Sequence, residues 1–235
     1  MQKVVAPCEA VLQVPDSGQL RLGPGLLAQD GHVFATRCGV LKQSKTGQQL
    51  WLEGRQKRYI PAELDVVVGT VVDRHGENLT VDIGAPFLAL LPQLSFEGAT
   101  RRNRPAVKAG DLVYARVLAA SRDMEPILSC TDTMGRAAGF GHLKEGLLTC
   151  VSTSLARHLL QNPPPAVLQA LGASVQFEMA VGMNGRVWIC GAVDPKDPAA
   201  SKKAAIIASN AIMNSEFLTE QQVRTLVSRM LQSSS

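Results

Sequence analysis

The feature of this sequence that most constrains its fold is a series of five short β-rich runs between Asp65 and Cys130. Turn signals separate the runs, such as Arg74-His75-Gly76-Glu77 and Gly110-Asp111. Runs rich in β-branched residues and bounded by Gly, Asp or Asn are typical of strands. The runs are DVVVGTVV, NLTVDIG, FLALL, LVYARVLAA and EPILSC. Five strands in about seventy residues, with one long connection between the third and the fourth, predict a Greek-key OB barrel.

Further β-rich runs precede the barrel, between Ala10 and Tyr59. Turn signals at Gly23-Pro24-Gly25 and Asp30-Gly31 interrupt them. The runs are AVLQV, HVFATRCGVL, QQLWLEG and KRYI. This spacing predicts a small antiparallel β domain over residues 1–61.

The pattern changes past Gly135, where helical periodicity joins the strand runs. We expect a strand at 147–152, helices at 154–160 and 165–171, a hairpin at 175–192 and a helix at 198–212. The order β-α-α-β-β-α is that of a KH domain. One further helix is expected over 219–231, where Thr219 and Gln222 form a capping box. The chain is therefore predicted to be multidomain and mainly β with a C-terminal α+β part: an N-terminal β domain (1–61), an OB barrel (62–133) and a KH domain (134–235).

Charge is unevenly distributed over these three segments. The formal net charge is +4, and the segments carry +4, −3 and +3 in chain order. A protein that gripped nucleic acid mainly by neutralising phosphates would be strongly basic along one face. We therefore expect any nucleic-acid binding to depend on local patches or on partner proteins.

The cysteine spacing and the apolar runs disfavour three classes of protein. The five cysteines are far apart and never form a C-x-x-C pair, which argues against a disulfide framework and against a thiolate zinc site. We interpret them as buried small hydrophobic residues. No apolar run approaches the roughly 18 residues that span a bilayer, so we expect no membrane partner.

The segment Val81–Pro105 is the most informative stretch for function. A Gly-bounded strand followed by an aromatic residue and a basic loop is typical of S1-type OB barrels. OB folds stack bases on aromatic side chains and track phosphates with cations. Other cations precede and follow the basic loop. The candidate RNA-binding residues are Arg74, His75, Phe87, Phe96, Arg101, Arg102, Arg104 and Lys108.

An ordinary alternative applies to each of these residues. Phe87 adjoins the apolar run FLALL, and a Phe in such a position is more often buried in a core than exposed to a base. A basic loop is usually solvated. In this net-acidic segment, it could as well bind an acidic protein surface.

Gly182-Met183-Asn184-Gly185 matches the G-x-x-G pattern with which KH domains clamp nucleotides. A clamping G-x-x-G joins the first two helices, where backbone N–H groups face phosphate. Here that junction is Gln161-Asn162-Pro163-Pro164-Pro165, which has no glycine. The Gly-Met-Asn-Gly segment lies between two strands instead, so we interpret Gly182, Asn184 and Gly185 as a packed hairpin turn. Trp188 is interpreted as an anchor between domains rather than a base platform.

The search for catalytic motifs finds little. The four histidines are scattered, and the sequence has no H-E-x-x-H, P-loop or G-x-S-x-G motif. Several aspartates of the barrel segment could in principle hold Mg²⁺ for a nuclease, but their spacing fits strand ends and turns better. They are Asp65, Asp73, Asp82, Asp111 and Asp123. We expect no active site, no metal and no cofactor.

Several runs of the sequence closely resemble one known family. They are LSFEGATRRNRP, KAGDLVYARV, DMEPILSC, GFGHLKEG, SLARHLL, FEMAVGMNGRVWI and NAIMNSEFLTEQQV. The resemblance begins at RLGPGL (Arg21 to Leu26), includes KRYIP (Lys57 to Pro61) and continues nearly to the C-terminus. The family is that of the S1/KH cap subunits of the eukaryotic RNA exosome, of the ribosomal RNA-processing protein 40 type.

The resemblance implies a fold and a function. Members of this family have no catalytic activity; with two other cap proteins they sit on a ring of six RNase PH-like subunits and thread RNA toward a separate 3′-to-5′ nuclease. The N-terminal domain docks on the ring, and the S1 domain faces the central pore. The implied partners are thus the ring and cap subunits of a hetero-oligomer and single-stranded RNA. The implied location is the nucleus and nucleolus, and also the cytoplasm.

Carried over residue by residue, the resemblance implies two sets of functional residues. The RNA-facing set is Arg74, His75, Phe87, Arg101, Arg102, Arg104 and Lys108. The structural turn set is Gly182, Asn184 and Gly185.

Two other functions compete with this reading. One is a stand-alone S1/KH regulator that selects transcripts without a ring, which the helix junction without glycines disfavours. The other is a metal-dependent nuclease that uses the barrel aspartates.

Overall fold

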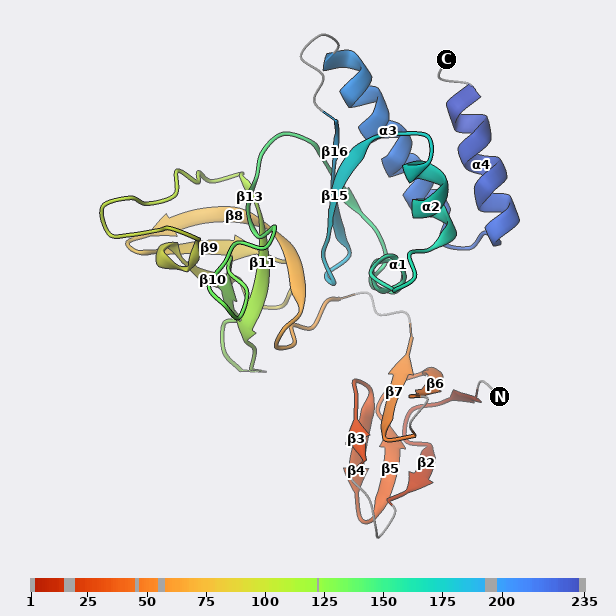
Figure 1. Ribbon diagram of the computed structural model, residues 1–235. Coiled ribbons are helices and arrows are strands. Elements are labelled where there is room, and N and C mark those ends of the chain that lie inside the picture. The colour runs from red at the N-terminus through yellow and green to blue at the C-terminus, as the bar shows by residue number, and fades with distance from the viewer. Residues whose placement is uncertain are drawn as a thin grey trace. The chain divides into compact units, whose positions relative to one another are not determined.

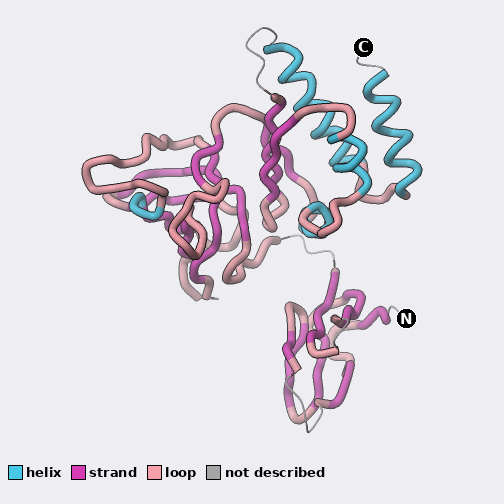
Figure 2. The backbone as a smooth tube through the Cα atoms, viewed as in Figure 1, coloured by secondary structure: helices cyan, strands magenta, loops and turns pink. Residues whose placement is uncertain are grey.

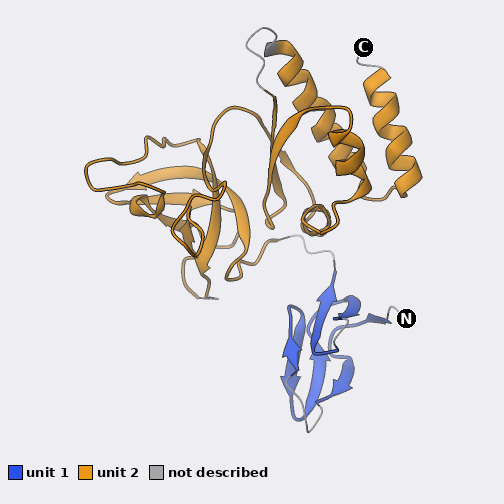
Figure 3. Ribbon diagram, viewed as in Figure 1, with its two compact units in different colours: residues 1–56 blue, residues 57–235 orange. Residues whose placement is uncertain are grey.

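The computed structural model describes residues 3–14, 20–44, 47–54, 58–121, 123–192 and 198–232. The chain divides into two compact units, residues 1–56 and 57–235 (Figure 3). Strands dominate the first unit and the first half of the second, and the α-helices gather toward the C-terminus (Figure 2). This is the mainly β, multidomain fold that the sequence predicts.

The first unit contains two small sheets. One has the order β1-β6-β7-β3, and the other has the order β2-β5-β4. Val5, Ala35 and Leu52 form their common core. The strands are β1 (Lys3–Val5), β2 (Ala10–Gln13), β3 (Arg21–Leu22), β4 (Leu26–Gln29), β5 (His32–Ala35), β6 (Gly39–Gln43) and β7 (Gln49–Glu53).

Two expectations for this unit are wrong in detail. The run HVFATRCGVL is not one strand but two, β5 and β6, which belong to different sheets. The described part of KRYI, residues 58–60, lies outside the strands, because it connects to the barrel instead of pairing within the first unit. The sheets are antiparallel as expected, except that β3 pairs with β7 in parallel.

A closed five-stranded barrel begins the second unit (Figure 1). Its strand order is β12-β10-β9-β8-β11, and β12 pairs with β11 as well, which closes the barrel. Inward residues alternate along the strands: Val113, Ala115 and Val117 are fully buried. The elements are β8 (Val66–His75), β9 (Asn78–Asp82), β10 (Ala89–Pro92), the 3₁₀ turn η1 (Gln93–Ser95), β11 (Leu112–Ala119), β12 (Ile127–Ser129) and the added β13 (Gly141–Leu143).

The C-terminal part has the predicted β-α-α-β-β-α order followed by an extra helix. Its sheet order is β14-β16-β15, and the sheet lies between the barrel and the helices (Figure 1). Leu171, Ile189 and Ile212 are buried where the helices meet this sheet. The elements are β14 (Leu147–Cys150), α1 (Thr153–Leu159), α2 (Ala166–Gly172), β15 (Phe177–Val181), β16 (Arg186–Gly191), α3 (Pro198–Asn214) and α4 (Glu220–Gln232).

Local capping explains two of the helix starts. Ser152 accepts a hydrogen bond from the Leu155 N–H (3.0 Å) and caps α1. At α4, the Thr219 N–H donates to Gln222 Oε1 (2.9 Å), which is the side-chain-to-backbone half of the predicted capping box. None of the described helices is long and apolar enough to cross a membrane.

The cysteines only partly follow the expectation of burial. Cys130 and Cys190 are buried, whereas Cys8, Cys38 and Cys150 are exposed. Cys8 lies in a turn with a φ of 65°, and Cys150 ends β14, so neither position faces a core.

Candidate nucleic-acid interface

One end of the barrel is built around the two-residue turn between β8 and β9. His75 pairs with Asn78 across the turn, and Gly76 has a φ of 58°, which glycine adopts at the least cost. Strand β10 returns to this end, because Pro92 pairs with Asn78. The chain therefore enters η1 and the basic loop directly beside the turn.

A buried glutamine joins the turn to the segment that follows β10. Gln93 is only 2% exposed. Its Nε2 donates to the Gly76 carbonyl (3.1 Å), and its Oε1 accepts from Arg74 Nη2 (3.1 Å). Its backbone N–H donates to the carbonyl of Glu77 (2.9 Å). Arg74 is thus already engaged in holding this end of the barrel together.

The basic loop, residues 99–104, is tied to the same turn by Arg104. The Arg104 guanidinium contacts Glu77 Oε1 (3.4 Å) and donates from Nε to the Arg101 carbonyl (3.3 Å). A small turn closes the loop, in which the Thr100 N–H donates to the Asn103 carbonyl (2.9 Å). The loop is therefore held at its base, close to the hairpin.

Arg101 and Arg102 differ from these braced cations. Both are exposed, and their guanidinium groups carry no hydrogen bond or ion pair within the described ranges. His75 is exposed and lies 3.1 Å from Asp73, measured from Nε2 to Oδ2. Lys108 is exposed too, and its backbone N–H donates to Asp111 Oδ2 (2.8 Å). Free, solvent-facing guanidinium groups are the ones able to bind phosphate in a bidentate manner.

The structure separates the aromatic candidates from the basic ones. Phe87 is 46% exposed, so the alternative that it is buried is wrong. It lies before β10, at the end of the strands where Val81 pairs with Ala89, and therefore opposite the turn at Gly76. Phe96 lies near the basic loop, but it is partly buried and packs against the barrel core.

The Gly-Met-Asn-Gly turn contacts the barrel. Asn184 Nδ2 donates to the carbonyls of Val68 (2.8 Å) and Ile83 (2.9 Å), and Asn184 Oδ1 accepts from the Val68 N–H (3.3 Å). The Met183 N–H donates to the carbonyl of Val66 (2.7 Å). A Cβ at Gly182 would lie 2.6 Å from the Val68 nitrogen. The turn is thus filled by the barrel and leaves no room for a phosphate.

An ion pair reinforces this junction. Arg186, at the start of β16, contacts Asp82 at the end of β9, with Nη2 to Oδ2 at 2.6 Å. Burial by itself would raise the pKa of Asp82. Hydrogen bonds from Arg186 and from the Gly84 N–H outweigh it, so that the pKa of this carboxyl lies below its ordinary value.

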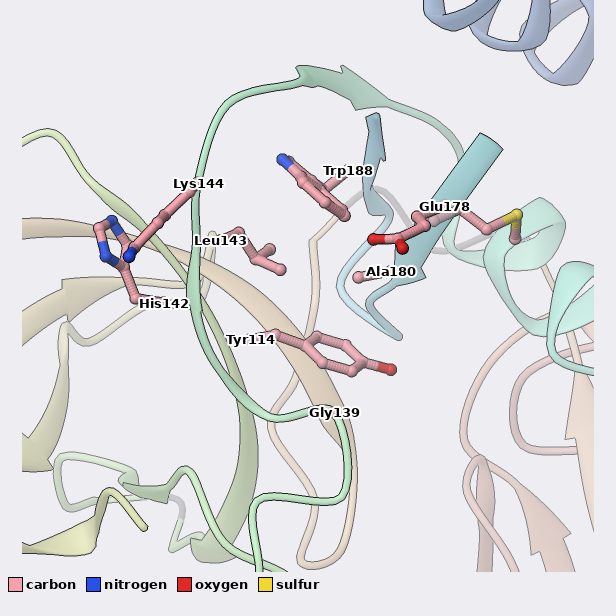
Figure 4. Close-up of a pocket in the computed structure, with 9 residues that line it drawn as sticks. Tyr114, Gly139, His142, Leu143, Lys144, Glu178, Ala180 and Trp188 are labelled. Carbon is pink, nitrogen blue, oxygen red and sulfur yellow. The ribbon is translucent and has the colours of Figure 1, made fainter. Parts of the chain in front are cut away.

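Trp188 lies at the same junction, 7% exposed. It shares a cluster with Val68 of the barrel, next to Leu112 and Tyr114, and its Nε1 donates to the Glu145 carbonyl (2.6 Å). A groove of about 660 Å³ opens beside it (Figure 4). Lys144 and His142 come from the barrel side of the groove and Glu178 from β15, so its lining carries both signs of charge.

The barrel aspartates do not gather into one site. Asp65 accepts from the Tyr59 hydroxyl (2.8 Å), Asp73 faces His75, and Asp111 faces His142 (3.4 Å). Burial raises the pKa of Asp65. In the part of the chain that the structure describes, no three His, Cys, Asp or Glu side chains are placed to hold a metal ion.

Comparison with known proteins identifies the family. The family model for the S1 domain of exosome complex component RRP40 matches residues 59–141, a KH-domain model matches 146–194, and the Rrp40 N-terminal domain model matches 20–58. The exosome complex component rrp40 of Schizosaccharomyces pombe is 41% identical over 221 residues, which cover 89% of this chain and 88% of that protein. The chain belongs to the RRP40 family of exosome complex components.

Other RRP40 proteins match over similar lengths. The Homo sapiens protein is 37% identical over 217 residues (90% of this chain, 76% of that protein), and the Drosophila melanogaster protein is 39% identical over 212 residues (89% and 87%). A solved crystal structure with 21% identity shares the fold, with a TM-score of 0.60 over 76% of this chain and 100% of that chain. The RRP40 S1 model ends at residue 141 and so reaches β13.

Sequence reasoning missed the residues that organise the RRP40 basic loop. Gln93 carries no motif and follows an ordinary apolar strand, and glutamine is mostly exposed in proteins. In the sequence, Glu77 is only the last residue of the Arg74–Glu77 turn signal. The Asp82–Arg186 pair joins residues 104 positions apart. Nothing local in the sequence signals such pairs.

Proposed function

We propose that this chain is a non-catalytic, RNA-binding cap subunit of the RNA exosome. In this role, it stabilises the complex and guides RNA into the central channel for 3′-to-5′ processing and degradation, including rRNA processing, RNA turnover and quality control. Its partners are RNase PH-like ring subunits, the other cap subunits and single-stranded RNA. Its location is the nucleus and nucleolus, and also the cytoplasm.

The observation that supports this proposal most is the contrast between the two glycine-bearing turns. The Gly-Met-Asn-Gly turn, which matches the G-x-x-G pattern but joins two strands, is occupied by the barrel through Asn184. RNA contact is left to the basic loop, where Arg101 and Arg102 are free. A small electrostatic patch on the basic loop and a locked S1–KH unit suit guiding RNA within an assembly better than selecting RNA alone.

The proposed RNA-binding face comprises the loop and the turn beside it. Arg101 and Arg102 contact phosphates directly, and His75 and Lys108 extend the positive surface. Arg74 and Arg104 shape the face while they contribute charge. Phe87, at the other end of the strands, contacts only RNA that extends along the barrel.

The non-catalytic part of the proposal rests on the dispersed aspartates. Each of Asp65, Asp82 and Asp111 has a local partner, and a nuclease would need two or more carboxylates converging on one metal. The test is turnover of labelled RNA by the isolated chain with Mg²⁺. We expect none. Magnesium-dependent cleavage that is lost in Asp111→Asn would establish the nuclease instead.

The test of the cap role is affinity purification of the tagged chain from its native cells, with mass spectrometry of the proteins retained at moderate salt. We expect RNase PH-like subunits in near-equal amounts with the chain. Recovery of RNA without such subunits would favour a stand-alone S1/KH regulator and overturn the cap assignment.

A further inference from the structure

Gln93 is a buried amide at the end of the barrel, in η1. Transfer of an amide from water into an apolar environment is costly unless its donors and acceptors find partners. Gln93 is 2% exposed, and both ends of its side chain are bonded, to Gly76 and to Arg74. A buried amide with this satisfaction defines one arrangement of the groups around it, because any other arrangement leaves a polar group unpaired.

The groups that Gln93 joins lie in the β8–β9 turn and at the end of β8. Gly76 and Glu77 form the β8–β9 turn, and Arg74 is the residue two positions before Gly76. Gln93 itself opens the long connection that carries the basic loop. Its three bonds therefore join η1 to the end of β8 and to the turn that follows it. They fix the start of the connection against the turn.

Arg104 fastens the far side of the basic loop to the same turn. It contacts Glu77, whose carbonyl also accepts the backbone N–H of Gln93. Its Nε also holds the Arg101 carbonyl. The loop bearing Arg101 and Arg102 is thus held at both ends through one turn, by Gln93 on one side and Arg104 on the other.

The arginines at this end of the barrel therefore fall into two groups, those with protein partners and those exposed to solvent. Arg74 and Arg104 are engaged with Gln93 and Glu77, whereas Arg101 and Arg102 present free guanidinium groups to solvent. The charge of Arg104 is offset by Glu77, so the net positive charge of the loop comes from Arg101 and Arg102. Binding to phosphate is tighter when such groups are held in place before the ligand arrives.

We propose that Gln93 is a positioning residue of the RNA-binding face, which holds the loop so that Arg101 and Arg102 contact phosphates of single-stranded RNA. This inference rests on the proposed RNA-binding function. Gln93 is uncharged and buried, so it would affect RNA affinity only through the position of the basic loop and not by contacting RNA.

The test is a double-mutant cycle in the intact chain, with a fluorescent oligouridine as the probe. Gln93→Met keeps the length of the side chain but removes both hydrogen-bonding ends. It is compared with the double variant Arg101→Gln/Arg102→Gln and with the triple variant. We expect Gln93→Met to weaken binding by about threefold or more in the original background, and to have no further effect once both arginines are gone.

A control separates positioning from general loss of stability. Leu128→Ala removes a fully buried core side chain from β12, which takes no part in the basic loop. At a temperature where both variants are folded, Leu128→Ala should bind RNA as the original chain does. Hydrogen exchange provides a second measurement: amides of residues 99–104 should exchange faster in Gln93→Met, while those of β11 remain protected.

The outcomes separate the inference from the function beneath it. If the double arginine variant binds weakly but Gln93→Met binds normally, or if Gln93→Met has the same effect in both backgrounds, the positioning role is overturned and the RNA-binding face stands. If neither change affects binding, the RNA-binding face itself is wrong. Faster exchange at 99–104 together with coupled loss of affinity is the result that establishes the role.

Discussion

The two glycine-bearing turns of the second unit invite comparison. Gly76 lies in an exposed hairpin between β8 and β9, beside free arginines; Gly182 and Gly185 lie in a hairpin between β15 and β16 that is packed against the barrel. The first turn matches no nucleotide-binding motif, whereas the second matches one. The difference teaches that the availability of a turn's polar groups decides what it can bind. The side-chain amide of Asn184 already donates to barrel carbonyls, so it is not free to donate to a phosphate.

The largest expected effect comes from replacing Asn184, which locks the second turn. Asn184→Ala leaves the Val68 and Ile83 carbonyls and the Val68 N–H without their partner at the junction. We expect a loss of about 2–4 kcal/mol in the free energy of unfolding, because buried polar groups left unpaired are costly. Urea unfolding measures this, with Asn103→Ala in the exposed loop as the control. A loss as small as that of Asn103→Ala would mean that the turn does not lock the junction.

The next largest effect is on RNA affinity and is expected from the two free arginines near the exposed turn. Arg101→Gln/Arg102→Gln should weaken binding of single-stranded RNA about tenfold at low salt. It should also reduce the slope of log K against log salt by about 1.4, since each phosphate contact with a single strand contributes about 0.7. Fluorescence anisotropy over a salt series measures both quantities. The matched control is Lys202→Gln/Lys203→Gln on α3, which removes the same charge from exposed positions. If both variants lost the same affinity for RNA, the basic loop would contribute only through its net charge and not as a specific binding site.

Phe87 tests whether RNA extends from one end of the barrel to the other. A base stacked on Phe87 would contribute about 1–3 kcal/mol. Because Phe87 lies opposite the basic loop, Phe87→Ala should weaken the binding of RNA long enough to reach both ends, and should not change the binding of a trinucleotide. Anisotropy with a short and a long oligouridine makes this comparison, with Leu94→Ala, another exposed apolar residue, as the control. A loss that is equal for both lengths would place the two ends on one site.

The smallest expected effect is the pH dependence of the locked junction. The pKa of Asp82 is lowered in the folded protein, so its stabilisation is present above the unfolded pKa of about 4 and is lost as the pH falls through the folded value. Asp82→Asn should cost about 1 kcal/mol or less at pH 7, because the side chain is 40% exposed and its ion pair is screened. Thermal unfolding from pH 7 to pH 3 should show a gentler decline for Asp82→Asn than for the original chain. Parallel declines would show that Asp82 does not contribute.

Much of the fold was predictable because it depends on local patterns. The alternation in LVYARVLAA places Val113, Ala115 and Val117 inside the barrel, as a half-buried strand requires. The helix order and the cap at Thr219 followed from the same kind of pattern. The extent of β8 did not: it runs on to His75 through a bulge, beyond the predicted end at residue 72. The position of a bulge depends on the partner strand.

The candidate site was predictable by residue type but not by grouping. The basic loop and the turn at Arg74 were both recognised, and the structure brings them together through Gln93 and Arg104. The S1 pattern of an aromatic residue followed by a basic loop groups Phe87 with these cations, yet the hairpin of β9 and β10 places it at the opposite end. The exposed position of Cys150 was missed because it depends on where β14 ends and which of its faces is covered.

The sequence by itself determined the order of the barrel and KH elements and the family, because strand alternation, turn residues and helix caps act over a few neighbouring positions. Only the tertiary structure decided which polar groups remain free. Asn184 is hydrogen-bonded to Val68, which is 116 positions away in the sequence, and Arg74 is hydrogen-bonded to Gln93, which is 19 positions away. Such meetings arise from the closure of the barrel and its packing against the KH sheet. A glycine-rich turn that resembles a nucleotide clamp is therefore closed in this protein, whereas an unremarkable hairpin supports the free arginines.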